Sequence, residues 1–132
     1  MKALLIEDHE ATALVIARAI EAMGDAVARA NSVASAVEVL TREQFDVIVS
    51  DIALPDGNGI PLIYAVREFC QVPAIALTGY GNREDIERCL RAGFNRHLTK
   101  PVTFETLRQT IAEVSAPTRL RNSWARVSGR VR

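Results

Sequence analysis

Five short apolar runs alternate with five longer amphipathic segments along the first 114 residues of the chain. The runs lie at about 3–6, 25–30, 45–50, 73–78 and 94–99, and the run at 25–30 is the weaker one. The central run at 45–50 leaves no room for a polar face, which is typical of a strand buried on both sides of a sheet. The longer segments repeat apolar residues at helical spacing over about 12–23, 33–40, 59–69, 83–92 and 104–114. This alternation with short connections predicts an α/β fold, in which helices cover both faces of a parallel sheet through right-handed crossovers.

The helical spacing also predicts which residues are buried. In the first helix the expected face comprises Thr12, Val15, Ile16, Ala19, Ile20 and Met23. The corresponding faces of the second, third and last helices comprise Val33, Ala36, Val37 and Leu40, then Leu62, Ile63 and Val66, then Phe104, Leu107 and Ile111. Gly24 is expected to end the first helix, and Ser32 to cap the second.

At 132 residues the chain is long enough for one domain with a substantial core. It has no apolar run of membrane-spanning length, and Met1-Lys2 leads directly into a strand rather than into a signal peptide. Cys70 and Cys89 do not form a metal-ligand spacing, so we expect reduced thiols in a cytoplasmic protein.

The net charge of zero conceals an asymmetry between the body and the end of the chain. Residues 1–116 hold all 16 acidic residues and 11 of the 16 basic ones, whereas residues 117–132 hold five arginines and no acid. The expected organisation is therefore an acidic domain at 1–116 followed by a basic C-terminal tail at 117–132.

Polar side chains stand where the predicted strands end. They are Glu7 and Asp8 after the first strand, Asp51 after the third, Thr78 after the fourth and Lys100 after the fifth. The carboxyl ends of parallel strands share one edge, so these groups are expected to form one pocket. Carboxylates about 4 Å apart repel by about 4 kcal/mol per pair at an effective dielectric of about 20, so the cluster needs cations.

Lys100 supplies one cation, and a hard divalent ion is expected to supply the other. Oxygen ligands without His or Cys favour Mg²⁺, or Mn²⁺ in its place, over zinc. Such a pocket suits a phosphoryl group, with Asp51 as the nucleophile that forms an aspartyl-phosphate. Lys100 and Thr78 would hold the phosphoryl oxygens as charge develops.

These residues resemble the receiver domain of two-component response regulators over about residues 2–116. Glu7-Asp8 match the acidic pair, Asp51 the phospho-acceptor, Leu54-Pro55 with Gly59 the turn after it, Thr78 the switch hydroxyl, and Lys100-Pro101 the lysine with its cis-prone proline. The resemblance implies a flavodoxin-like (βα)5 doubly wound parallel sheet with strand order 2-1-3-4-5. It also implies direct Mg²⁺ ligation by Asp8, Asp51 and the backbone carbonyl of Ala53, with Glu7 reaching the metal through water.

The chain departs from the family pattern at the switch position. His97 stands where an aromatic Tyr or Phe is usual, as in receivers similar to those in or beside hybrid sensor kinases, although a plain surface imidazole on an edge strand is the alternative. Asn95-Arg96 replace the acidic pair of many DNA-binding regulators, which argues against their charged dimer face.

Two further sets of residues take roles from the resemblance. Ala53 and Tyr80 would flank the path of hydrolytic water and so control the lifetime of the phosphoryl group. On the first helix, Ala11, Leu14 and Arg18 would dock a histidine-bearing helix of the partner.

The expected function is a free-standing receiver that accepts a phosphoryl group from a sensor histidine kinase or a histidine phosphotransfer protein. It would act as a phospho-switch, with only its own acyl-phosphate chemistry rather than turnover of a metabolite. It would then pass the phosphoryl on or change its contact with a downstream protein. The alternative within the family is a fragment of a longer regulator or hybrid kinase, and the Met1 start disfavours an internal position in a hybrid kinase.

Two other classes fit less well. An aspartyl-nucleophile phosphatase needs a second acid two residues after the nucleophile, where this chain has Ala53. A flavodoxin needs a hydroxyl-rich phosphate loop after the first strand, where Glu7-Asp8 would repel a phosphate.

The tail has its own pattern. Leu120, Trp124, Val127 and Val131 fall at helical spacing, and we expect a short amphipathic helix over about 118–128 with its arginines facing the acidic body or a second copy. A homodimer is thus one expected use of the tail, and a solvated basic extension is the alternative. Without a folded reader, nucleic-acid binding by such a stretch would be non-specific.

Overall fold

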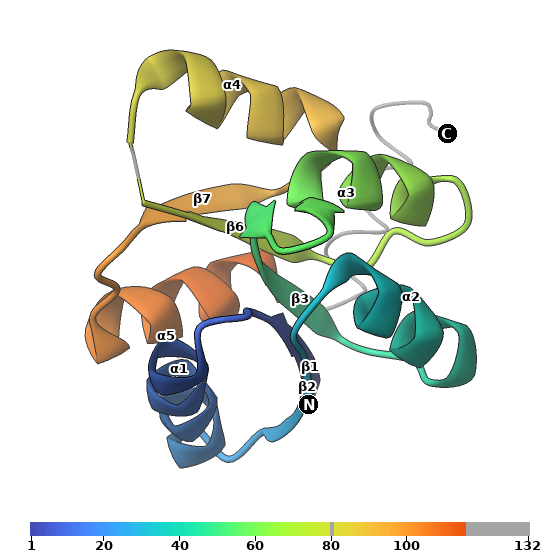
Figure 1. The fold of residues 1–132 in the computed structure, drawn as a ribbon. Helices are drawn as coiled ribbons and strands as arrows, with labels where there is room; N and C mark the ends of the chain where they lie inside the picture. The colour runs from blue at the N-terminus through green and yellow to red at the C-terminus, as the bar shows by residue number, and fades with distance from the viewer. Residues whose placement is uncertain (80, 116–132) are drawn as a thin grey trace, which may run out of the picture.

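The computed structural model describes residues 1–79 and 81–115. Its main feature is a five-stranded parallel sheet in the order β2-β1-β3-β6-β7 (Figure 1). The strands are β1 (Lys2–Ile6), β2 (Ala26–Ala30), β3 (Val47–Asp51), β6 (Ala74–Thr78) and β7 (Arg96–Thr99). Two very short strands, β4 (Ala53–Leu54) and β5 (Gly57–Asn58), form a separate hairpin. The order of the five main strands is therefore the predicted 2-1-3-4-5.

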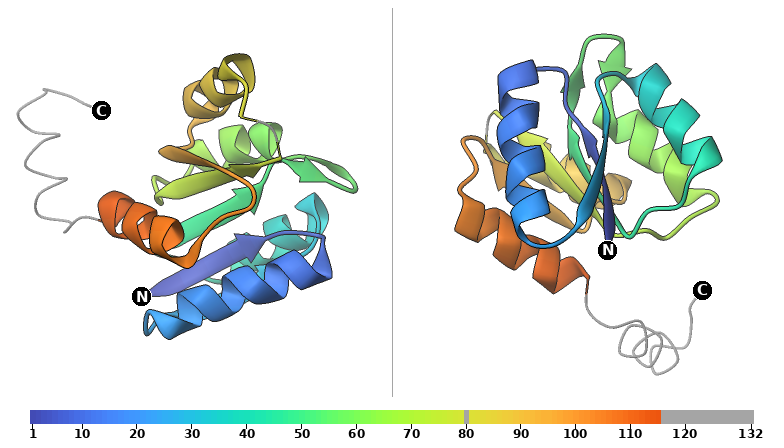
Figure 2. Two further views of the ribbon diagram at one scale, coloured as in Figure 1. Left: turned by 90° about the vertical axis from the view of Figure 1, so that its left-hand side faces the viewer. Right: turned by 90° about the horizontal axis from the view of Figure 1, so that it is seen from below.

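Five helices cover the two faces of the sheet, α1 (Glu10–Ala22), α2 (Val33–Arg42), α3 (Gly59–Arg67), α4 (Arg83–Ala92) and α5 (Phe104–Val114). Helices α1 and α5 pack on one face, and α2, α3 and α4 pack on the other (Figures 1 and 2). Alternate residues of each central strand serve the two layers: Leu4 and Ile48 face the α2–α4 layer, whereas Leu5 and Val49 face α1 and α5. Both faces of β1, β3 and β6 are buried, as their apolar composition predicted.

The predicted helix boundaries are confirmed by the caps. Ser32 accepts from the backbone N–H of Ser35 at the start of α2, and Gly24 follows α1 with a φ of 90°, a conformation that favours glycine. Asn82 and Thr103 cap α4 and α5 in the same way. Among residues 1–79 and 81–115, no helix has the length and apolar character needed to cross a membrane.

The predicted buried faces of α1, α2 and α5 are wrong in part. Helix α1 buries Ala13, Ile16, Ala17 and Ile20, and Val15 is 66% exposed. The helix is rotated from the predicted orientation, since Ala13 and Ala17 face the core in place of Val15. Val37 of α2 is exposed as well. Phe104 is 47% exposed because side chains point toward the N-terminus of their helix, so the first side chain of α5 projects past its end.

The β4–β5 hairpin is fastened at two points. The backbone N–H of Gly59 donates to the carbonyl of Ile52 at 2.9 Å. At the tip, Asp56 accepts from the N–H groups of Val33 and Ala34 at 2.8 and 3.1 Å, in the first turn of α2. These two backbone hydrogen bonds lower the pKa of the exposed Asp56 carboxyl. The loop that follows Asp51 is thus tied to a neighbouring helix.

Gly59 provides a test of this packing. A Cβ at this position would lie 2.8 Å from the carbonyl oxygen of Asp51 and 3.2 Å from the Cα of Ile52, both backbone atoms that cannot easily move aside. We expect Gly59→Ala to lower the free energy of unfolding by about 1–3 kcal/mol, the usual cost of overpacking. Urea denaturation measures this change. Gly79→Ala is the matched control, because a Cβ there meets no atom within 4 Å. Equal stability of the two variants would contradict the close approach.

Candidate functional site

The predicted site residues do converge at the carboxyl edge of the sheet. Glu7 follows β1, Asp51 ends β3, Thr78 ends β6 and Lys100 follows β7. Glu7, Asp51 and Thr78 are 3%, 7% and 2% exposed, whereas Asp8 is exposed. Parallel pairing explains the convergence, because Ile6 aligns with Ser50 and Asp51 aligns with Leu77 along the sheet.

Lys100 joins the two buried carboxylates. Its Nζ lies 2.6 Å from Oε1 of Glu7 and donates to Oδ2 of Asp51 at 2.7 Å. Burial alone would lower the pKa of Lys100, but the hydrogen bonds with Asp51 and Glu7 outweigh it and raise the pKa above its ordinary value. Burial raises the pKa of Glu7, although Lys100 and the backbone N–H of His9 oppose that effect. The ammonium therefore stays charged between its two partners.

The three carboxylates are close enough to share one cation. One oxygen from each of Glu7, Asp8 and Asp51 can be chosen so that all lie within 4.8 Å of one another. Three carboxylates against the single ammonium of Lys100 leave two negative charges to be compensated. An all-oxygen donor set with this charge fits Mg²⁺, and a small octahedral ion of this kind commonly uses few protein ligands. The residues present thus fit the ion that the sequence predicted.

The loop after Asp51 contributes through its backbone. The N–H of Ala53 donates to Oδ1 of Asp51 at 3.1 Å. Both oxygens of the Asp51 carboxylate are therefore hydrogen-bonded, Oδ1 to Ala53 and Oδ2 to Lys100. The Ala53 side chain is exposed and carries no polar group. Metal ligation by its carbonyl stays a prediction. The Lys100-Pro101 peptide bond is cis, as the resemblance implied.

His97 is in direct contact with the site hydroxyl. Its Nε2 lies 2.7 Å from Oγ1 of Thr78, across the β6–β7 pair. The ring is half-buried, and this burial lowers the pKa of His97 below its ordinary value. The alternative of a plain surface imidazole is wrong, because the ring is half-buried and hydrogen-bonded to Thr78, the residue expected to sense the phosphoryl group.

Other predicted residues are placed but not tested in their roles. Ala11, Leu14 and Arg18 are all exposed on α1, beside the exposed Val15, which the sequence had assigned to the core. Tyr80 and the tail at 117–132 lie outside the described residues.

Two structural roles were missed, one beside the site and one at the opposite edge of the sheet. His9 is exposed, and its Nδ1 accepts from the N–H of Thr12 and so caps α1 directly after the acidic pair. The spacing of His9 and Thr12 at the start of a helical pattern was the available signal. Asn95 accepts from the N–H of Ala74 and from Nη2 of Arg67, which anchors β7 to β6 and α3. No sequence pattern indicated this contact.

A family model for the response regulator receiver domain matches residues 3–112. The chain belongs to the response-regulator receiver family. An uncharacterized 14.6 kDa protein in the sodA1 3′ region of Leptolyngbya boryana is 40% identical to this receiver, over 77% of this chain and 80% of that protein. The sensor histidine kinase RcsC of Escherichia coli K12 is 30% identical over 84% of this chain, which spans only 12% of that kinase.

Solved receivers have the same fold. The receiver domain of the sensor histidine kinase PA1611 from Pseudomonas aeruginosa PAO1, described with a magnesium ion coordinated in its active site cleft, superposes with a TM-score of 0.81. It is 29% identical, and the match covers 88% of this receiver and 98% of that chain. A response regulator receiver domain from Clostridium thermocellum gives a TM-score of 0.84 at 24% identity. The predicted flavodoxin-like architecture is confirmed.

The burial of His97 predicts a pH-dependent contribution to stability. The pKa of His97 is lowered in the folded receiver, so the unfolded chain binds the proton first as the pH falls below about 6.5. We expect the free energy of unfolding to decrease below that pH and to level off once the folded form is also protonated.

The measurement is urea denaturation between pH 5 and 8 on the receiver and on His97→Gln. Glutamine keeps an N–H that can reach Thr78 but does not titrate, so the difference between the two curves isolates the imidazole. A difference that does not vary with pH would refute the burial effect.

Proposed function

We propose that this receiver accepts a phosphoryl group on Asp51 from a phosphohistidine of a partner protein and then changes its protein contacts or passes the group on. The observation that carries the proposal is the position of Asp51, buried at the sheet edge and held between the Lys100 ammonium and the N–H of Ala53. A purely structural aspartate would be satisfied by pairing with the lysine alone. Here a second carboxylate, that of Glu7, also lies 2.6 Å from the Lys100 ammonium.

The transfer breaks the P–N bond of the phosphohistidine and forms a P–O bond to a carboxylate oxygen of Asp51, and the imidazole leaves with its electron pair. Lys100 would move from its two carboxylates toward the phosphoryl oxygens and offset their charge. Thr78 would donate its hydroxyl proton to another phosphoryl oxygen. The backbone N–H of Ala53 would keep the nucleophile oriented.

Asp8 and Asp51 would hold Mg²⁺ directly with the carbonyl of Ala53, and Glu7 would do so through water. The ion supplies positive charge that allows a phosphoryl group to approach three carboxylates. The exposed Asp8 leaves the metal position open to solvent, whereas the burial of Glu7 suits an indirect role beside Lys100.

The phosphoryl state would be communicated through Thr78 to His97. A hydroxyl can donate to one group while it accepts from another. If Nε2 of His97 carries the proton, Thr78 can accept from the ring while donating to the phosphoryl group. A movement of Thr78 toward the phosphoryl group would then act directly on His97 in the edge strand β7. The face formed by α4, β7 and α5 would then change its affinity for a downstream protein.

A sensor histidine kinase or histidine phosphotransfer protein would dock on α1 through Ala11, Leu14 and Arg18. The support is their joint exposure, together with the exposed Val15, which extends the apolar part of this face. A fragment of a longer regulator or hybrid kinase would use the same chemistry. An aspartyl-nucleophile phosphatase is disfavoured because Ala53 supplies no acid, so the proposed activity is a phospho-switch without turnover of a metabolite.

The acceptor assignment is tested with a small phosphodonor. Intact-mass analysis after incubation with acetyl phosphate and Mg²⁺ is expected to show one added phosphoryl group, which is lost in Asp51→Asn and in excess EDTA. Asp56→Asn is the matched control, since Asp56 is an exposed carboxylate five residues away that binds only α2. Labelling of the Asp51 variant, or none in the receiver itself, would contradict the proposal.

The lifetime of the aspartyl-phosphate is expected to be long, because Ala53 carries no group that could orient a hydrolytic water. Ala53→Glu introduces a carboxylate at this exposed position, and we expect hydrolysis to become about a hundredfold faster, at the lower limit of general-base effects. Tyr80→Ala should also shorten the lifetime if that ring shields the phosphoryl group. Decay of the phosphorylated mass after removal of donor measures both. An unchanged decay rate in both variants would show that positions 53 and 80 do not control the lifetime of the phosphoryl group.

A further inference from the structure

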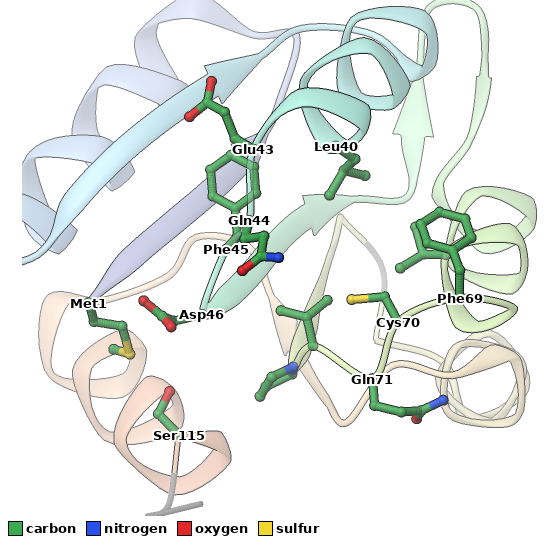
Figure 3. A pocket seen from close by; sticks show the side chains of 13 residues that line it. Met1, Leu40, Glu43, Gln44, Phe45, Asp46, Phe69, Cys70, Gln71 and Ser115 are labelled. Carbon is green, nitrogen blue, oxygen red and sulfur yellow. The ribbon is translucent and has the colours of Figure 1, made fainter.

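A large pocket lies at the edge of the sheet opposite to the phosphorylation site. It has a volume of about 660 Å³ and is lined by the segments that lead into β1, β3 and β6 and by the ends of α2, α3 and α5 (Figure 3). A volume of this size falls within the range of about 300–1,000 Å³ that is usual for ligand sites. Nothing in the proposed phosphoryl chemistry uses this edge of the sheet.

The pocket has an apolar wall of which Phe69 is the most exposed part, whereas Nζ of Lys2 lies 5.2 Å from the centroid of the Phe45 ring. Leu40, Phe45, Phe69 and Val72 all contribute to its lining, and Phe69 is 70% exposed at the end of α3. Figure 3 shows the Phe69 and Phe45 rings on different sides of the hollow. An exposed aromatic ring beside other apolar groups is typical of a surface that binds another apolar segment.

The position of Ser115 indicates which segment that is. Ser115 lines the pocket and is the last described residue, so residues 116–132 continue from the pocket rim itself. Leu120 and Trp124 stand five and nine residues further on. At about 3.3–3.6 Å per extended residue, either side chain can reach any part of the hollow. A covalently attached segment also acts at a high effective concentration, which a free ligand lacks.

The charges of the pocket and of this segment are complementary. Glu43 and Asp46 are the charged side chains in the lining, and both are exposed acids, whereas residues 117–132 carry five arginines and no acid. Lys2 also pairs with Glu43 from the neighbouring strand. Each carboxylate has a second oxygen, so this pairing leaves room for an arginine.

We propose that this pocket binds the chain's own C-terminal segment, with the Trp124 indole on the apolar wall formed by Phe69, Phe45 and Leu40 and with arginines of the segment at Glu43 and Asp46. This inference is independent of the proposed function, because the pocket shares no residue with the phosphorylation site.

Trp124 is the single tryptophan of the chain, so its fluorescence reports on the segment alone. In the full-length protein we expect an emission maximum at shorter wavelength than that of free N-acetyltryptophanamide, with weaker quenching by acrylamide. Phe69→Lys removes the exposed ring and places a positive charge near the arginines. It should lower the docking equilibrium constant about tenfold, which corresponds to about 1.4 kcal/mol, and move both signals toward those of the free amide.

Tyr64→Lys is the matched control. Tyr64 lies on α3, is 58% exposed and does not line the pocket, so its replacement adds the same charge without touching the proposed site. Because Phe69 and Tyr64 are both largely exposed, neither change removes a buried contact of the core, and circular dichroism verifies the fold. Sedimentation velocity at two concentrations establishes whether the protein is a monomer.

A monomer with a protected Trp124 that is released by Phe69→Lys but not by Tyr64→Lys supports the proposal. A solvent-exposed Trp124 in the unmodified chain would overturn it. If Trp124 is protected and Phe69→Lys does not change that protection, the segment binds elsewhere, and this result would also overturn the proposal. Protection that appears only with dimer formation would assign the pocket to a second copy instead.

Discussion

Repulsion among carboxylates at one edge of a parallel sheet is the constraint on which the rest of this receiver depends. Parallel pairing forces Glu7 and Asp51 together, and both are buried, so a cation must lie between them. Lys100 meets this need from the far side of the sheet, 49 positions after Asp51. Removing one partner of a buried pair typically costs about 3–5 kcal/mol, because the other charge is left uncompensated. The polar site therefore links the first, third and last strands energetically, and a group that draws Lys100 away alters all three.

The contact between Thr78 and His97 extends this linkage to the edge of the sheet. Thr78 is almost fully buried beside the acids, whereas His97 is half-buried on β7, which borders solvent. In the proposed switch, a change at the phosphoryl position would need only this hydrogen bond to reach the surface. Asn95 and Arg67 hold the start of the same strand against β6 and α3, so rotation of the His97 ring is an easier response than displacement of the strand.

The convergence of the site residues could be predicted because it follows from local patterns, whereas the strand order was implied by the resemblance to receivers. Buried strands are uniformly apolar, and a polar residue that ends each run is visible in the sequence. The buried face of α1 could not be assigned reliably, since its alanines fit either side and only the packing distance to the sheet selects Ala13 and Ala17 over Val15. The Asn95 and Asp56 contacts join residues more than 20 positions apart through single hydrogen bonds, which leave no periodic trace. The pocket at the opposite edge also depends on how six segments meet, which no single segment reveals.

The attachment of Asp56 to the first turn of α2 has a consequence for how the molecule opens locally. The hairpin cannot lift away from Asp51 without exposing the N–H groups of Val33 and Ala34, and the first turn of α2 cannot fray without freeing the hairpin. These two hydrogen bonds therefore couple the opening of the hairpin to the opening of the first turn of α2. The loop beside Asp51 is thus held to the start of a helix, whereas a free surface turn has no such attachment.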